Sequence, residues 1–208
     1  EIMIFGTAGL TAALSVNELI EHEIIPESGD ILVTGATGGV GSIAISILRK
    51  LGYNITAISG KKERVDFLKD IGANEVIFRE DFEKQSNKPL LSEKYAGVID
   101  TVGGTILANA LKQVKYDGVV TSCGLTSSYE LNTNVFPFIL RGVRLIGIDS
   151  VECKLEKKQA CWEKLASRWK INTLDTIVNE ISLKEIKTAY EHLLSGKAVG
   201  RYVVKIKE

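Results

Sequence analysis

The chain has 208 residues, 45% of them hydrophobic and 25% charged, so it is long enough to bury a sizeable core and fits one large domain or one and a half. Lysine plus arginine equals aspartate plus glutamate at 26 each, a balance that argues against nucleic acid or an anionic membrane as a partner. The chain has three cysteines without C-x-x-C spacing, which argues against a disulfide scaffold or a zinc ribbon and favours a cytoplasmic location. It has no run of about 18 apolar residues and no signal-peptide pattern, which argues against a membrane span.

Helix-like and strand-like segments alternate along the chain. Residues 6–20 carry small and apolar side chains at helical spacing and predict a helix ahead of the first strand. Short runs rich in valine and isoleucine then alternate with amphipathic stretches, which is typical of a parallel sheet covered on both faces. The predicted strands are 31–34, 54–59, 75–78, 97–101, 118–123 and 144–148, and the predicted helices are 40–51, 62–71, 105–114, 154–169 and 183–194. The sequence therefore predicts an α/β fold, a Rossmann-type doubly wound and mainly six-stranded parallel sheet with helices on both faces.

The first predicted strand breaks into glycines and is followed directly by a helix. Thr37, Gly38, Gly39 and Val40 lie in this turn, where glycines let the backbone approach a pyrophosphate and the helix start offers free N–H groups to it. Gly41 is expected to let the helix sit close to the strand. A glycine-rich turn without a ligand is the alternative, but the flanking strand and helix favour a dinucleotide site.

The end of the second predicted strand indicates which dinucleotide binds. An NAD site usually carries an acidic residue there, whereas this chain has Ser59, Gly60 and Lys61. A carboxylate would repel a 2′-phosphate, and a hydroxyl with an ammonium attracts one, so the sequence predicts NADPH as cofactor. Arg79, after the third strand, is a second candidate cation for the phosphate or the adenine. A solvated helix start and a surface arginine are the alternatives for these residues.

Small residues follow the fourth and fifth predicted strands, where a ligand of such a sheet is expected. Asp100 there is a candidate for the ligand edge or for a helix cap, and Cys123 is more typical of a buried apolar filler than of a nucleophile. His22 and His192 lie in charged helical surroundings and are expected at the surface. The spacing of His, Cys and acidic residues indicates no metal site.

Six motifs over nearly the whole chain carry a resemblance to a known family. They are GTAGLTA (6–12), VTGATGGVGS (33–42), SGK (59–61), IDTVG (99–103), PFILRG (137–142) and IDS (148–150). The chain resembles the zinc-independent quinone oxidoreductase branch of the medium-chain dehydrogenase/reductase superfamily, and within it the acryloyl-coenzyme A reductase-like group. The resemblance implies hydride transfer from NADPH to an activated alkene such as a quinone, an enone or an enoyl-CoA, acryloyl-CoA among them.

The resemblance also implies further site residues and a domain beyond this chain. Leu125, Ile139 and Ser150 match family positions that touch the cofactor, and Lys61 stands where relatives often have arginine. Family members carry an N-terminal GroES-like domain that forms the other wall of the cleft. We therefore expect residues 1–200 to be the NADPH-binding domain and 201–208 to be a strand that returns towards that absent domain. On this view the fragment alone is inactive, and its catalytic residues and proton donor are unknown.

Two other functions stay open. A non-catalytic NADPH-sensing module would bind the cofactor without oxidising it, because fold does not dictate function. A zinc-type alcohol dehydrogenase domain is disfavoured by Ser59 and by the motif at 137–142. The predicted strand 144–148 near the sheet edge is a candidate for pairing with its copy in a homodimer.

Overall fold

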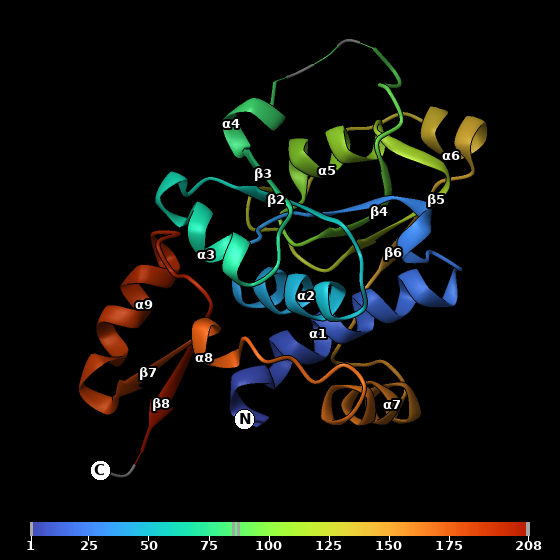
Figure 1. Ribbon diagram of the computed structural model, residues 1–208. Coiled ribbons are helices and arrows are strands. Elements are labelled where there is room, and N and C mark those ends of the chain that lie inside the picture. The colour runs from blue at the N-terminus through green and yellow to red at the C-terminus, as the bar shows by residue number, and fades with distance from the viewer. Residues whose placement is uncertain (1, 85, 87, 207–208) are drawn as a thin grey trace.

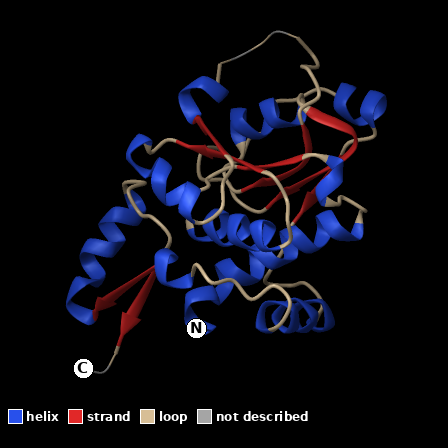
Figure 2. Cartoon of the chain, viewed as in Figure 1, coloured by secondary structure: helices blue, strands red, loops and turns tan. Residues whose placement is uncertain are grey.

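A six-stranded parallel sheet forms the centre of the computed structural model, which describes residues 2–84, 86 and 88–206 (Figures 1 and 2). Its strand order is β3-β2-β1-β4-β5-β6, so successive strands are added towards one edge up to β3 and towards the other edge from β4 onwards, and the strand order reverses between β1 and β4. The strands are β1 (Asp30–Val33), β2 (Ile55–Ser59), β3 (Glu75–Phe78), β4 (Tyr95–Asp100), β5 (Val114–Ser122) and β6 (Arg144–Gly147). The predicted doubly wound parallel sheet is thereby confirmed.

Helices cover both faces of this sheet. The α-helices of the described residues are α1 (Ile2–Glu21), α2 (Gly39–Lys50), α3 (Val65–Asp70), α4 (Arg79–Phe82), α5 (Gly104–Leu111), α6 (Phe136–Arg141), α7 (Leu155–Ala166), α8 (Leu174–Ile177) and α9 (Ile186–Leu194), the last of which lies beside the sheet and not on it. The alternation of side chains along β1 shows the two layers, because Ile31 and Val33 pack with α1 and α2 while Leu32 faces α5. All three side chains are fully buried, which explains why the strands of this sheet are continuous apolar runs.

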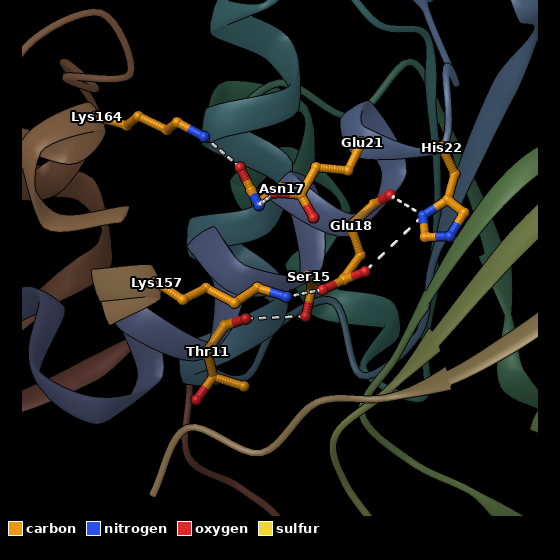
Figure 3. Close-up of polar contacts among 8 residues, drawn as sticks. All are labelled: Thr11, Ser15, Asn17, Glu18, Glu21, His22, Lys157 and Lys164. Carbon is orange, nitrogen blue, oxygen red and sulfur yellow. Dashed lines mark hydrogen bonds and ion pairs between the residues drawn. The ribbon is translucent and has the colours of Figure 1, made fainter. Parts of the chain in front are cut away.

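Helix α1 crosses the sheet beside α2 and α7 (Figure 1). Polar groups fix α7 to it: Asn17 accepts a hydrogen bond from Lys164 and donates one of 2.7 Å to Glu21, while Glu18 pairs with Lys157 (Figure 3). Among the described residues α1 is the one helix long and apolar enough to cross a membrane by length and composition, and 67% of the apolar stretch is buried within the fold.

The C-terminal part forms a small unit with its own two-stranded sheet beside α3 (Figure 1), and Gly200 of this part contacts Thr37 after β1. Strand β7 (Val178–Ser182) leads through η3 (Leu183–Glu185) into α9 and then into β8 (Arg201–Lys205), which pairs with β7 in parallel. The predicted terminal strand thus pairs within this chain, and its last residues, 207 and 208, lie outside the described residues. The proposed domain boundary at residue 200 stays a prediction.

Candidate functional site

The phosphate loop has the geometry that its glycines predict. Helix α2 begins at Gly39, its N-cap is Gly38, and no side chain caps its first N–H groups. Gly41 packs against the loop so closely that a Cβ there would lie 2.5 Å from the carbonyl oxygen of Gly35. Gly41 thus allows a close approach of α2 to the loop after β1, two residues beyond the strand for which it was expected. The N-terminus of α2 carries the positive end of the helix dipole, and its free N–H groups can bind an anionic ligand.

A groove of about 710 Å³ runs along the carboxyl ends of β1, β2, β4 and β5. This is the crevice in which doubly wound sheets bind ligands, next to the point where the strand order reverses. Eight of the predicted site residues line it: Thr37, Gly38, Gly39, Val40, Ser59, Gly60, Lys61 and Arg79. Among the described residues that line the groove there is no carboxylate, and there are two basic side chains, Lys61 and Arg79.

The turn after β2 brings the polar side chains of the site together. Ser59 is buried, and its Oγ accepts a 3.0 Å hydrogen bond from the backbone N–H of Lys61. The exposed side chain of Arg79, the first residue of α4, packs over Gly60, where a Cβ would lie 2.3 Å from its Nη2. The serine hydroxyl hydrogen and the guanidinium both remain able to donate to an anion.

Lys61 spans the groove to the C-terminal unit. Its Nζ donates a 3.2 Å hydrogen bond to Thr37 Oγ1 and another to the carbonyl oxygen of Ala198. Both partners are neutral oxygens, so the positive charge of the ammonium is not compensated by them. Burial lowers the pKa of Lys61 below its usual value, with Arg64 and Arg79 adding to this effect and Glu63 opposing it.

Asp100 supports the floor of the groove and does not face a ligand. It is fully buried and accepts hydrogen bonds from Thr34 Oγ1 at 2.7 Å and from the N–H of Gly103 at 2.9 Å. Thr34 in turn accepts from the N–H of Thr101, which ties β1 to β4. Burial raises the pKa of Asp100, and these hydrogen bonds oppose the rise. Neither role left open for Asp100 is observed: it does not line the groove, and the N-cap of α5 is Gly103, with Asp100 closing the turn before it.

Cys123 lines the groove, but its thiol is poorly suited to nucleophilic chemistry. Burial, with the nearby Asp100 carboxylate, raises the pKa of Cys123 to about 11. His192 lies outside this groove, and its Nδ1 is 3.0 Å from the hydroxyl of Tyr202. His22 is at the end of α1 beside Glu18 (Figure 3). These placements agree with the sequence-based view that none of the three is a catalytic candidate.

Leu125, Ile139 and Ser150 do not line the groove. Leu125 follows Gly124, which does, but its side chain is 66% exposed, and Ile139 on α6 is 68% exposed. Ser150 is half-buried in the segment after β6. Their contact with the cofactor stays a prediction from the family resemblance.

The C-terminal wall of the groove was not predicted from the sequence. It consists of Leu193, Leu194, Gly196 and Ala198, at the end of α9 and in the segment 195–200, which we call the strap. The strap is also joined to the phosphate loop by a 2.8 Å hydrogen bond from the N–H of Gly200 to the carbonyl oxygen of Thr37. The two glycines around a lysine at 196–200 were the available signal, but nothing local links them to residues more than 130 positions earlier.

Metal ligands are not gathered anywhere in the described part of the chain, where no three His, Cys, Asp or Glu side chains come together. Cys123, Cys153 and Cys161 are free thiols. The described residues therefore do not fit a zinc ion.

The fold and the groove are those of a dinucleotide-binding domain, and comparison with known proteins defines the class. The model of the zinc-binding dehydrogenase family matches residues 39–169, and the chain belongs to this family. Although the family is described as zinc-binding, the described residues of this chain hold no group of three His, Cys, Asp or Glu side chains that could bind a metal ion.

Particular relatives lie in the group that the motifs indicate. YhfP of Bacillus subtilis strain 168, whose name assigns it provisionally as a quinone oxidoreductase, is 47% identical over 99% of this chain and 63% of its own length. The acrylyl-CoA reductase AcuI of Ruegeria pomeroyi is 39% identical over 99% of this chain and 62% of its own length. The resemblance stated from the motifs is confirmed, and the chain spans less than two thirds of these relatives.

Solved structures of similar proteins have the same fold as this chain. YhdH of Escherichia coli K-12 with bound NADPH superposes with a TM-score of 0.95 at 42% identity, covering 99% of this chain and 63% of that one. YhfP of Bacillus subtilis with NAD bound superposes with a TM-score of 0.94 at 47% identity, covering 98% of this chain and 62% of that one. Both nicotinamide dinucleotides thus occur among similar structures.

Proposed function

We propose that this chain is the NADP(H)-binding portion of an oxidoreductase that transfers hydride to an activated alkene. One observation carries the choice of cofactor: the groove between the phosphate loop and the end of β2 is lined by Lys61 and Arg79 and, among its described residues, by no carboxylate. A 2′-phosphate brings about two negative charges that a carboxylate would repel and cations attract. The NADPH bound to YhdH supports this assignment.

The residues of the groove bind and orient, and each group has a separate task. The N-terminus of α2 with Gly38, Gly39 and Val40 would hold the pyrophosphate through backbone N–H groups. Ser59, Lys61 and Arg79 would hold the 2′-phosphate and the adenosine. When bound, the nicotinamide supplies the hydride, and the chain contributes its placement.

The proposed substrate class is supported by the names of two relatives, a quinone oxidoreductase and an acrylyl-CoA reductase. In both reactions a hydride adds to an electron-poor carbon and a proton from water or an acid completes the reduction. Among the described side chains that line the groove, those with exchangeable protons are hydroxyls, the ammonium of Lys61, the guanidinium of Arg79 and the thiol of Cys123, whose pKa of about 11 disfavours loss of its proton. The substrate and its proton donor would therefore be placed with the help of a GroES-like domain outside this chain.

A homodimer is proposed from the edge of the sheet. Strand β6 is the last strand of the six, and within the described residues its outer edge is unpaired. An open edge invites pairing with a second copy. Light scattering of the full-length protein is expected to give twice the monomer mass, and a monomer mass would contradict the proposal.

The experiment for the proposed function is turnover by the full-length protein. We expect NADPH to be oxidised in the presence of acryloyl-CoA or a quinone, and to be oxidised less well as pH rises towards the lowered pKa of Lys61, since only the ammonium form attracts the 2′-phosphate. Tight NADPH binding without turnover of quinones, enones or enoyl-CoA esters would contradict the oxidoreductase and favour an NADPH-sensing module instead.

A further inference from the structure

The side chain of Lys61 is held in one place, although a lysine is normally free to move. A lysine has a flexible stem and three N–H donors without a fixed direction, whereas the planar fork of an arginine is oriented by its own geometry. Here Thr37 Oγ1, at 3.2 Å, and the carbonyl oxygen of Ala198 take two of the three donors. The third has no partner among the described residues, and Lys61 lines the groove.

We propose that Thr37 is a positioning residue for cofactor selection: its hydroxyl, together with the Ala198 carbonyl, fixes the Lys61 ammonium so that its remaining N–H meets the 2′-phosphate of NADP(H). This inference rests on the proposed function and extends it from the phosphate loop to the strap. The hydroxyl and the carbonyl fix the direction of the N–H donors of this lysine, as the planar guanidinium fixes the direction of the donors of an arginine.

The two polar atoms of Thr37 have separate roles, which makes the proposal testable. Its carbonyl oxygen accepts from Gly200 and holds the strap, while its hydroxyl accepts from Lys61. Thr37 is buried, and valine has the same branched shape without the hydroxyl. Thr37→Val therefore removes the contact with Lys61 and leaves the backbone contact with the strap in place.

The experiment compares dissociation constants of NADPH and NADH, measured by calorimetry on the full-length protein. Thr37→Val is expected to lower the preference for NADPH about fivefold, which corresponds to one side-chain hydrogen bond, and Thr37→Ser to keep it. Thr37→Ala serves the same comparison if the valine variant does not fold. The matched control is Thr173→Val, which removes a 2.8 Å side-chain hydrogen bond to Ser46 away from the groove.

A double variant separates positioning from a general effect on the loop. With Lys61→Arg in place, the added Thr37→Val is expected to leave the NADPH preference unchanged, because the arginine orients its own donors. An equal loss of NADPH and NADH affinity in Thr37→Val, or an unchanged preference, would overturn the positioning role. If Lys61→Ala also leaves the preference unchanged, or if neither dinucleotide binds, the proposed function fails and not this role alone.

Discussion

The central sheet and the C-terminal unit β7-α9-β8 both contain parallel strands, but they are built differently. Every residue of β2 and β4 is buried, whereas no residue of β7 or β8 is. Helix α9 leaves Tyr190 63%, Leu193 58% and Leu194 81% exposed. The sheet is thus stabilised by its own core, while the C-terminal unit depends on its contacts with the sheet domain.

The groove lies where these two regions meet, so its two walls differ in stability. The phosphate loop is fixed by the buried network around Asp100, and the opposite wall is held by polar contacts of the strap and of Arg201, whose Nε donates to the carbonyl oxygen of Ile4 at 2.9 Å. We infer that cofactor binding joins a rigid wall to a more mobile one.

The largest expected difference is in amide hydrogen exchange. Amides of β4 are expected to exchange only on global unfolding, and amides of β7 through local opening, at rates at least about a thousandfold higher. The measurement is exchange followed by NMR or mass spectrometry. Equal protection of the two strands would break the comparison between the regions.

A matched pair of substitutions tests the same difference by stability. Val98 in β4 is fully buried and Val203 in β8 is half-buried, so Val98→Ala is expected to lower the free energy of unfolding by about 2 kcal/mol and Val203→Ala by less than about 1 kcal/mol. Urea titration of both variants measures this. A larger loss for Val203→Ala would show that β8 belongs to the core.

Substitutions at the two glycines of the strap test how firmly the strap is held against α8. Gly200 and Gly196 both have positive φ, 62° and 69°, but a Cβ at Gly200 would lie 2.0 Å from the carbonyl oxygen of Ile177, and at Gly196 nothing lies within 4 Å. Gly200→Ala is therefore expected to raise amide exchange in the strap about tenfold, more than Gly196→Ala does. Equal effects of the two variants would mean that the strap is not held against α8.

The smallest expected effect is on the rigid wall, at the thiol of Cys123. With its pKa at about 11, about one molecule in a thousand carries the thiolate at pH 8, and alkylation should accelerate up to pH 11. Mass spectrometry after iodoacetamide treatment, with Cys123→Ser to assign the site, measures the rate. Fast alkylation at pH 8 would indicate that this wall opens.

Much of the central sheet could be predicted from the sequence because buried parallel strands are continuous apolar runs. Strand β3 has the predicted bounds, and the others differ by a few residues at their ends. Strand β7 was missed because Val178–Ser182 contains an asparagine and a glutamate in an exposed strand. The short helices α4, α6 and α8 were also missed, since four to six residues carry too little periodicity.

The site also has a part that could be predicted from the sequence and a part that could not. The phosphate loop and the turn after β2 carry local signals, glycines before a helix and a missing carboxylate, and their residues do line the groove. The wall formed by the strap arises from contacts such as that between Lys61 and Ala198, 137 positions apart, which no local pattern encodes. Leu125 and Ile139 were predicted from the family resemblance and not from a local signal, and their side chains are exposed outside the groove.

The central claim is that Lys61 selects the 2′-phosphate, and calorimetric titration with NADPH and NADH tests it most directly. Lys61→Ala should weaken NADPH binding about ten- to a hundredfold towards the NADH level, as expected for loss of a charged hydrogen bond. Lys62→Ala, which removes a neighbouring lysine paired with Glu80 at 3.1 Å outside the groove, should leave the preference unchanged. Equal affinity of the unmodified protein for both dinucleotides, or an unchanged preference in Lys61→Ala, would contradict the account.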